Sequence, residues 1–575
     1  MTRGQVMERL GVILVHGIGE QKRFAHLDSE LRGLIEGFKR RPGARVTVEI
    51  LSGSAVTYNA EQDTWAGGSD PSARVTVVEP DRAVEINVHE VWWADVNEPY
   101  SLAKQVRFWL WGLSMWSFPR SPGRDDLPGY REAMLTPQTP EQTAFDRGFV
   151  RAQLFMAGTF FLVAAFSLGA AVFFAKRLFG LEPPDFVRVF VNYISGVKLY
   201  NQSTRQGSGF LPNRHGFLDT LDDPPRFSIR RRMIQAVVAV GARPPGKAYD
   251  RWYVLGHSLG SIVSFNGVME PGQSFANYLT RDSWDELKAN GFAGPARPAP
   301  HDPPDWVKVP PGTMSPTRPV WLADNELVYR DKIFANFRGL LTYGSPLGKF
   351  AELWPARVPV NKVEPIFSDK VKWINVYDGR DPVSGLMKAF NAEVLAPEGV
   401  TPRHCPTLQG FGYAASSVLL LSHIRYLKTR GETKQQLPDV LADWLMTGTF
   451  TPPTIGQGRW YDTKTYWHRV NGSWIWWLVA FAVLAVLGTI TFKWLWQLAV
   501  ASWLKGPSWL LSLTDWLGGL NFGFQVLAFA GGCILTVLLV GLIGGMVFED
   551  AKKPADPNPV STAPPGRQPG PQVTG

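Results

Sequence analysis

A serine flanked by two glycines stands between two apolar runs at residues 252–263, which read WYVLGHSLGSIV. A serine hydroxyl becomes a strong nucleophile only when a base activates it and the backbone exposes it. The Gly-x-Ser-x-Gly pattern meets the second requirement, because Gly256 and Gly260 leave room for a sharp turn from a strand into a helix. The apolar run before Ser258 predicts the strand, and LGSIVSFNGVM after the turn predicts an amphipathic helix. We therefore expect Ser258 to be a nucleophile.

The chain beyond this serine offers a base and an acid. His423, in LLLSHIRYLK, is the expected base, and His404, in PRHCPT, is its rival. A carboxylate at the end of a parallel strand can orient an imidazole, and the strand-like VKWINVY runs into DGRDPVSG. Asp381 is the favoured acid, and Asp378 is the alternative. Such a set predicts acyl transfer through a covalent intermediate, which needs no metal and no cofactor.

A tetrahedral oxyanion needs two backbone N–H donors that are fixed in advance. The first predicted strand of the chain ends in HGIGE, residues 16–20. This loop is expected to supply one donor, from Ile18 or from Gly17. Leu259 directly follows the serine and is expected to supply the other.

Strand-like segments recur along the chain and are bounded by Gly, Pro or Asp. Several are apolar throughout rather than alternating, which is typical of a parallel sheet covered by helices on both faces. The sequence thus predicts an α/β, doubly wound and mostly parallel sheet. The predicted strands are residues 11–16, 45–51, 83–93, 252–257, 339–344 and 371–377.

Five stretches together resemble the α/β-hydrolase family, and within it the lipase-like membrane hydrolases: VILVHGIGE, VLGHSLGS, LLTYGSPLGKF, WINVYDGRDPVS and SHIRYL. The resemblance covers roughly residues 10–95 and 250–430. It implies Ser258 as nucleophile, His423 as base and Asp381 as acid, in the chain order of that fold, with oxyanion donors at Ile18 and Leu259. More than two hundred residues separate the first strand from the serine, so material must be inserted there.

Three stretches are apolar enough to span a bilayer, which takes about 20 residues. They are residues 153–175, 474–492 and 522–548. Eight of the 23 tryptophans lie between Trp474 and Trp516, as in the aromatic belts of membrane interfaces. The last two stretches predict a transmembrane hairpin. Basic residues outside its two ends favour a cytoplasmic catalytic domain at the inner membrane.

The loop at 16–20 and Ser258 must meet in one site, so an even number of crossings must separate them. We expect residues 153–175 to pair with a second crossing at 101–119, in which Arg107 would lie near the headgroups. The alternative is that 153–175 lies in the membrane plane or forms a lid.

Bulk composition narrows the possible partners. The net charge is +9, which suits an anionic membrane surface, and no nucleic-acid motif is present. The two cysteines exclude a disulfide framework and a Cys-based zinc site. The first residues lack the features of a secretory signal.

The leading hypothesis is a membrane-anchored serine hydrolase acting on lipid or acyl esters. A membrane scaffold on the same fold and an acyl-protein thioesterase are the alternatives, and the oligomeric state stays open. The predicted organisation comprises the first part of the α/β-hydrolase domain (1–100), inserted membrane-associated helices (101–180), the rest of the hydrolase domain with a cap (181–450), the transmembrane hairpin (470–548) and a disordered Pro-rich tail (549–575).

Overall fold

The structure is a computed structural model of the 575-residue chain. The residues it describes are 7–17, 24–51, 57–59, 64–66, 71–94, 200, 225–296, 316, 318–353, 358, 370–381, 383–385, 387, 390, 408–416, 422–429, 435–461, 482, 485–486, 489–490, 521, 524–529 and 531–532.

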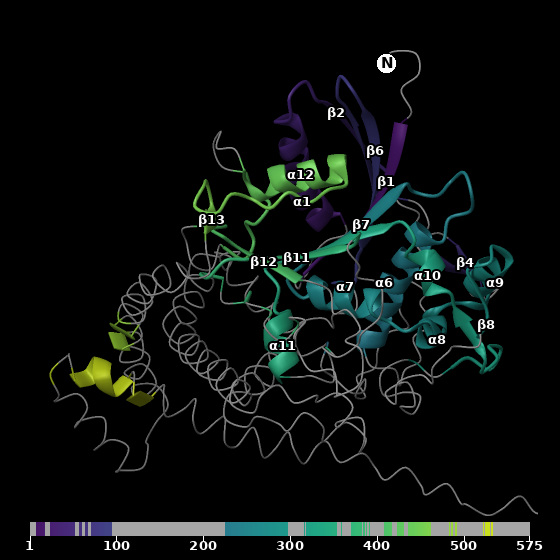
Figure 1. Cartoon of the computed structure of the whole chain (residues 1–575). Coiled ribbons are helices and arrows are strands. Elements are labelled where there is room, and N and C mark those ends of the chain that lie inside the picture. The colour runs from purple at the N-terminus through teal and green to yellow at the C-terminus, as the bar shows by residue number, and fades with distance from the viewer. Residues whose placement is uncertain are drawn as a thin grey trace, which may run out of the picture.

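A nine-stranded sheet organises the described part of the chain, with strand order β13-β12-β11-β10-β7-β1-β6-β5-β2 (Figure 1). The six strands from β12 to β6 run parallel, whereas β5 is antiparallel to both of its neighbours and β13 is antiparallel to β12. This confirms the predicted α/β class with a mostly parallel sheet. The strands are β1 (Met7–Val15), β2 (Arg45–Ile50), β5 (Ala73–Val78), β6 (Ala83–Val91), β7 (Arg251–His257), β10 (Phe337–Tyr343), β11 (Lys372–Tyr377), β12 (Leu408–Tyr413) and β13 (Trp460–Tyr461).

Helices cover both faces of the sheet, and each face has its own apolar core. On one face lie α1 (Ala25–Lys39) and α12 (Leu437–Thr447), which pack against each other. On the other lie α6 (Pro225–Gly241) and α7 (Gly260–Val268). The remaining helices are α8 (Gly272–Phe275), η2 (Ala276–Tyr278), α9 (Arg281–Ala289), α10 (Arg330–Ile333) and α11 (Leu347–Leu353), and two small hairpins pair β3 (Thr57–Asn59) with β4 (Thr64–Ala66) and β8 (Ala293–Pro295) with β9 (Glu326–Val328).

The continuous apolar runs of the central strands follow from this two-sided burial. Successive side chains of a strand point to opposite faces. In β1, Leu10, Val12 and Leu14 therefore enter the core beneath α1 and α12. Ile13 and Val15 enter the core beneath α6 and α7. In a strand with only one buried face, apolar and polar residues would alternate along the chain instead.

All six predicted strands are present, with ends shifted by a few residues. The prediction that an amphipathic helix follows the serine was wrong in one respect. The helix α7 is there, but every one of its residues is buried. Two of its polar side chains make internal hydrogen bonds: the Ser261 hydroxyl donates to the Gly256 carbonyl, and the Asn266 amide donates to the Tyr200 hydroxyl.

The strand order reverses direction around β1. The chain first adds β2, β5 and β6 on one side of β1 and then β7, β10, β11 and β12 on the other. In open α/β sheets, ligands bind at such a switch point, outside the carboxyl ends of the strands. Here that edge is formed by the residues that follow β1 and β7, namely Gly17 and Ser258.

The predicted bilayer-spanning stretches lie wholly or largely outside the described residues, as do residues 101–180 and the tail at 549–575. Within the described part, no helix has both the length and the apolar character needed to cross a membrane. The sheet itself continues to β13, past the predicted domain boundary at residue 450.

Candidate active site

Ser258 lies on a strained turn between β7 and α7. Its φ angle is +55°, in the left-handed region that residues with a side chain rarely adopt. A Cβ atom on Gly256 would lie 2.6 Å from the Ser264 Oγ, and one on Gly260 would lie 2.4 Å from the Val15 carbonyl oxygen. Both glycines are therefore required by close backbone packing. Strain of this kind persists where the surrounding structure enforces it and is common at active sites.

His423 contacts this serine directly. Its Nε2 lies 2.9 Å from the Ser258 Oγ, and its Nδ1 lies 2.9 Å from the Asp381 Oδ2. The carboxylate accepts the Nδ1–H, which leaves Nε2 as the acceptor for the serine hydroxyl. The three residues, predicted from distant stretches of the sequence, thus form one continuous hydrogen-bonded chain. Their exposed fractions are 1% for Ser258, 9% for His423 and 3% for Asp381, so the chain is shielded from bulk water.

Three donors hold Asp381 in place. Besides the imidazole, its Oδ2 accepts the Tyr426 hydroxyl at 2.9 Å, and its Oδ1 accepts the Val383 N–H at 2.8 Å. Burial by itself would raise the pKa of Asp381. The nearby His423 and these hydrogen bonds outweigh burial, and the net shift of its pKa is downward. The carboxylate is therefore ionised and oriented toward the imidazole.

Asp378, the alternative acid, has a different role. Its Oδ2 accepts the Ala415 N–H at 2.8 Å, and its Oδ1 accepts the Arg380 N–H at 2.9 Å. Burial raises its pKa to about 6, and the backbone hydrogen bonds offset only part of that effect. Asp378 joins the turn after β11 to the chain beyond β12 and makes no hydrogen bond to His423 among the described contacts. The structure thus separates two acids that the sequence left as alternatives.

The backbone after β1 lies against the serine. A Cβ atom on Gly17 would be 2.6 Å from the Ser258 Cβ and 3.1 Å from its Oγ, so only glycine fits there. Leu259 stands at the start of α7, where the first N–H groups have no acceptor within the helix. Gly17 and Leu259 therefore flank the nucleophile from two elements. Ile18, the other predicted donor, and His404, the rival base, lie outside the described residues.

Sequence reasoning missed Tyr426, which lies three residues after His423 in the stretch SHIRYL. Its hydroxyl accepts the Asp378 N–H at 2.9 Å and donates to Asp381, so one side chain ties both acids together. Burial raises the pKa of Tyr426 well above its usual range, so it keeps this proton. Its position in the sequence, three residues after the expected base, could have indicated that Tyr426 lies near the site.

His257, inside the glycine-flanked motif, was also missed. Its Nε2–H donates to the His423 carbonyl at 2.8 Å, and the two rings lie 5.1 Å apart between centroids. Burial, followed by the neighbouring His423, lowers the pKa of His257 to about 3, so its imidazole is neutral. His257 therefore holds the backbone of His423 in place through this hydrogen bond.

Comparisons with known proteins identified no relative of this chain. A scan against protein-family models, a search of curated proteins and a search of solved structures each returned no match.

Proposed function

We propose that this chain is a membrane-associated serine hydrolase of the α/β-hydrolase type, which cleaves carboxylic esters of lipids or acylated molecules through an acyl-enzyme intermediate. One observation carries the proposal: the hydrogen-bonded chain from Asp381 through His423 to a positive-φ Ser258. Nucleophile, base and orienting acid recur in this arrangement on unrelated folds, and geometry rather than sequence position identifies it.

In the acylation step, the His423 Nε2 takes the Ser258 proton while the Oγ attacks the ester carbonyl carbon. Asp381 stays ionised and stabilises the imidazolium that forms. The developing oxyanion lies beside the backbone around Gly17 and Leu259, where N–H donors and the start of α7 favour negative charge. The imidazolium then gives its proton to the leaving alcohol, and the acyl group stays on Ser258.

Deacylation reverses these roles with water as the nucleophile. The His423 Nε2 takes a proton from water, and the hydroxide oxygen attacks the acyl carbon. Collapse of the second tetrahedral intermediate returns the proton to the Ser258 Oγ and releases the carboxylic acid. In both steps the transferred proton passes through the His423 Nε2. The proposed reaction is complete with the triad, the backbone donors and water, and it needs no metal or cofactor.

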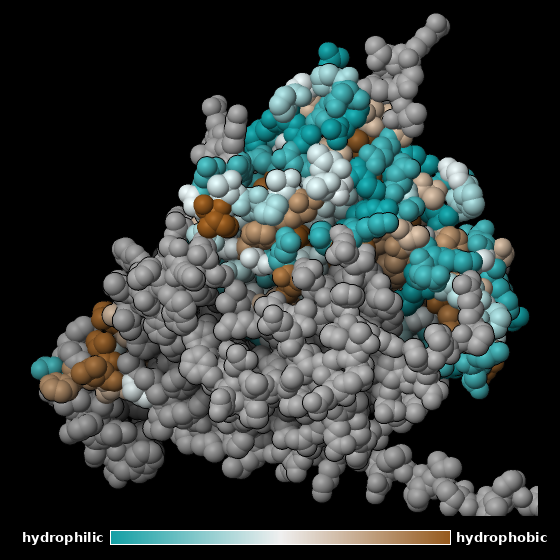
Figure 2. All heavy atoms as spheres, viewed as in Figure 1, coloured by the Kyte–Doolittle hydropathy of each residue, from teal (hydrophilic) through white to brown (hydrophobic). Residues whose placement is uncertain are grey.

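The membrane part of the proposal is supported by composition and exposure. The stretches 153–175, 474–492 and 522–548 are apolar and carry few charges. Among the described positions in the last two stretches, Ile490 is 51% exposed, Phe524 58% and Leu527 66%. The short helical segment that includes residues 524–529 is coloured hydrophobic in Figure 2, whereas the visible surface around the sheet is largely hydrophilic. Exposed apolar clusters of this kind mark membrane or protein contacts.

The contact between Gly17 and Ser258 constrains the topology. Both residues must lie on one side of any bilayer, so crossings between them must occur in pairs. This favours either a hairpin of 101–119 with 153–175 or no crossing at all in that interval. The proposed catalytic domain then faces one compartment, which we assign to the cytoplasm from the basic residues outside the C-terminal hairpin.

A substrate panel tests the proposed reaction. The purified full chain in lipid vesicles is assayed on p-nitrophenyl esters of increasing acyl length, on phospholipid and on an acyl thioester. We expect ester hydrolysis that increases with acyl length and is lost in Ser258→Ala. Ser264→Ala is the matched control, because this buried serine of α7 has no hydrogen-bond partner for its Oγ among the described residues.

Each outcome of the panel decides between the alternatives. Turnover of the thioester alone would replace the lipid-ester assignment with the thioesterase. A folded wild-type chain that hydrolyses none of the substrates would favour the scaffold. Activity that Ser258→Ala retains would contradict the proposed nucleophile.

A further inference from the structure

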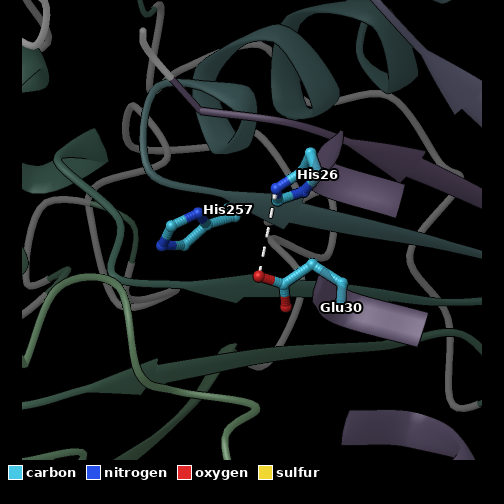
Figure 3. A group of neighbouring side chains, drawn as sticks. All are labelled: His26, Glu30 and His257. Atoms are coloured by element: carbon cyan, nitrogen blue, oxygen red, sulfur yellow. Dashed lines mark ion pairs between the residues drawn. The ribbon is translucent and has the colours of Figure 1, made fainter. Parts of the chain in front are cut away.

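Three buried side chains with metal-binding atoms lie together beside the serine turn, on the side of α1. His26 and Glu30 are one turn apart on α1, and His257 ends β7 (Figure 3). One potential ligand atom from each residue lies within 4.8 Å of the other two. The exposed fractions are 5% for His26, 9% for Glu30 and 7% for His257. A buried cluster of this kind must be balanced by hydrogen bonds or by a bound group.

Hydrogen bonds do not satisfy this cluster. The Nε2–H of His257 donates to the His423 carbonyl, and its Nδ1 is buried without a hydrogen-bond partner among the residues that the structure describes. The Nε2 of His26 is also buried without a partner in the described part of the chain, and its Nδ1 lies 3.9 Å from the Glu30 Oε1, beyond hydrogen-bond distance. Buried polar atoms are nearly always paired in folded proteins. These two nitrogens, in one cluster with the Glu30 carboxylate, therefore have the electron pairs to bind a ligand.

We propose that His26, Glu30 and His257 bind one divalent transition-metal ion of the zinc class. Two imidazoles and one carboxylate are a donor set that zinc accepts, whereas calcium and magnesium prefer oxygen ligands alone. The spacing of four residues places His26 and Glu30 on the same face of α1. Ligands of a tetrahedral zinc ion stand about 3.4 Å apart, given bonds of about 2.0–2.1 Å. Binding would thus draw the three side chains together by up to about 1.4 Å.

The surroundings already resemble the outer shell of a metal site. The second nitrogen of a metal-binding histidine usually donates to a carbonyl or carboxylate, which fixes the ring. His257 does this through its hydrogen bond to the His423 carbonyl. The other oxygen of Glu30, Oε2, accepts the Tyr343 hydroxyl at 3.0 Å, which orients the carboxylate. The ring of Tyr343 in turn stacks on His257, with 4.9 Å between centroids.

An ion at this position would link α1 to the turn that carries Ser258. The ligand His257 is adjacent to Ser258 in the chain, and its other nitrogen supports the backbone of His423. The ion would therefore be structural and positioning, and it takes no part in the reaction proposed above. Its existence can be tested without any measurement of ester hydrolysis.

The test uses the untagged full chain after removal of metals with a chelator. We expect one equivalent of Zn²⁺ to bind in a calorimetric titration, and one equivalent of Co²⁺ to give the intense visible absorption bands of low-coordinate cobalt. His26→Gln and Glu30→Gln should each weaken Zn²⁺ binding by about 100-fold or more, because loss of an outer-shell partner alone typically costs 10–100-fold. His89→Gln is the matched control, since His89 is a buried histidine of β6 bonded to the Tyr249 hydroxyl. It should bind Zn²⁺ as the wild type does.

Wild-type chain that binds no Zn²⁺, or that binds Co²⁺ with only weak octahedral bands, would overturn the proposal without recourse to any variant. Equal affinity in the wild type, His26→Gln and Glu30→Gln would place the ion elsewhere and overturn it as well. Circular dichroism of each variant establishes that a loss of binding is not a loss of fold. Because ester hydrolysis is not the readout, a failure here leaves the proposed reaction standing.

Discussion

Replacing His423 with alanine is expected to reduce kcat for the proposed ester hydrolysis by roughly 10⁶-fold, the size of the loss when the base of a Ser-His-Asp triad is removed. The physical reason is that one imidazole makes both essential contacts. Its Nε2 lies 2.9 Å from the Ser258 Oγ, and its Nδ1 lies 2.9 Å from the Asp381 Oδ2. Without it, the serine hydroxyl loses the acceptor for its proton, and the buried Asp381 carboxylate loses the Nδ1–H that it accepts.

The measurement is single-turnover hydrolysis of the best ester from the substrate panel, at equal amounts of folded protein. His404→Ala serves as the control, because His404 is the rival base from the sequence. It should keep wild-type kcat. A His423→Ala variant that keeps more than a small fraction of kcat, or a large loss in His404→Ala, would show that another group accepts the serine proton.

The second large effect is expected at the acid. Asp381→Asn should reduce kcat by about 10⁴-fold, because an amide in place of the carboxylate favours the wrong imidazole tautomer. Asp378→Asn is the matched control and should change kcat less than tenfold. It makes the same substitution three residues away, and Asp378 bonds to backbone N–H groups rather than to His423.

The comparison is made by kcat and by unfolding of each variant, since both carboxylates are buried. Equal losses in the two variants, with both proteins folded, would mean that the site depends on the whole turn rather than on one acid. A larger loss in Asp378→Asn than in Asp381→Asn would exchange their assigned roles.

Sequence could predict the parts of this site that are set by local chemistry. The strand–turn–helix around Ser258 follows from apolar runs and two glycines, and the central strands follow from their uninterrupted apolar residues. The sequence did not predict β5, β12 and β13, which lie at or next to the edges of the sheet. The strand β12 reads LQGFGY, with two glycines, and β13 has only two residues, so their pairing is decided by their neighbours in the sheet.

The sequence favoured Asp381 but left Asp378 open as the alternative acid. Both stand in one turn, and only the three-dimensional path of the chain decides which carboxylate meets His423. The same holds for Tyr426, whose hydroxyl contacts Asp381 from 45 residues further along. The cluster of His26, Glu30 and His257 brings together residues of α1 and β7 that are more than two hundred positions apart in the chain. No local sequence pattern predicts such a contact.

Labelling with a fluorophosphonate probe will show whether Ser258 is an activated nucleophile. Such a probe forms a covalent adduct with a serine only when a base and an oxyanion site act on it. The full chain in membranes is labelled, digested and mapped by mass spectrometry, with Ser258→Ala and Ser264→Ala beside it. We expect one adduct, on Ser258, in the wild type and in Ser264→Ala, and none in Ser258→Ala. A folded wild type that stays unlabelled, or an adduct on another serine, would contradict it.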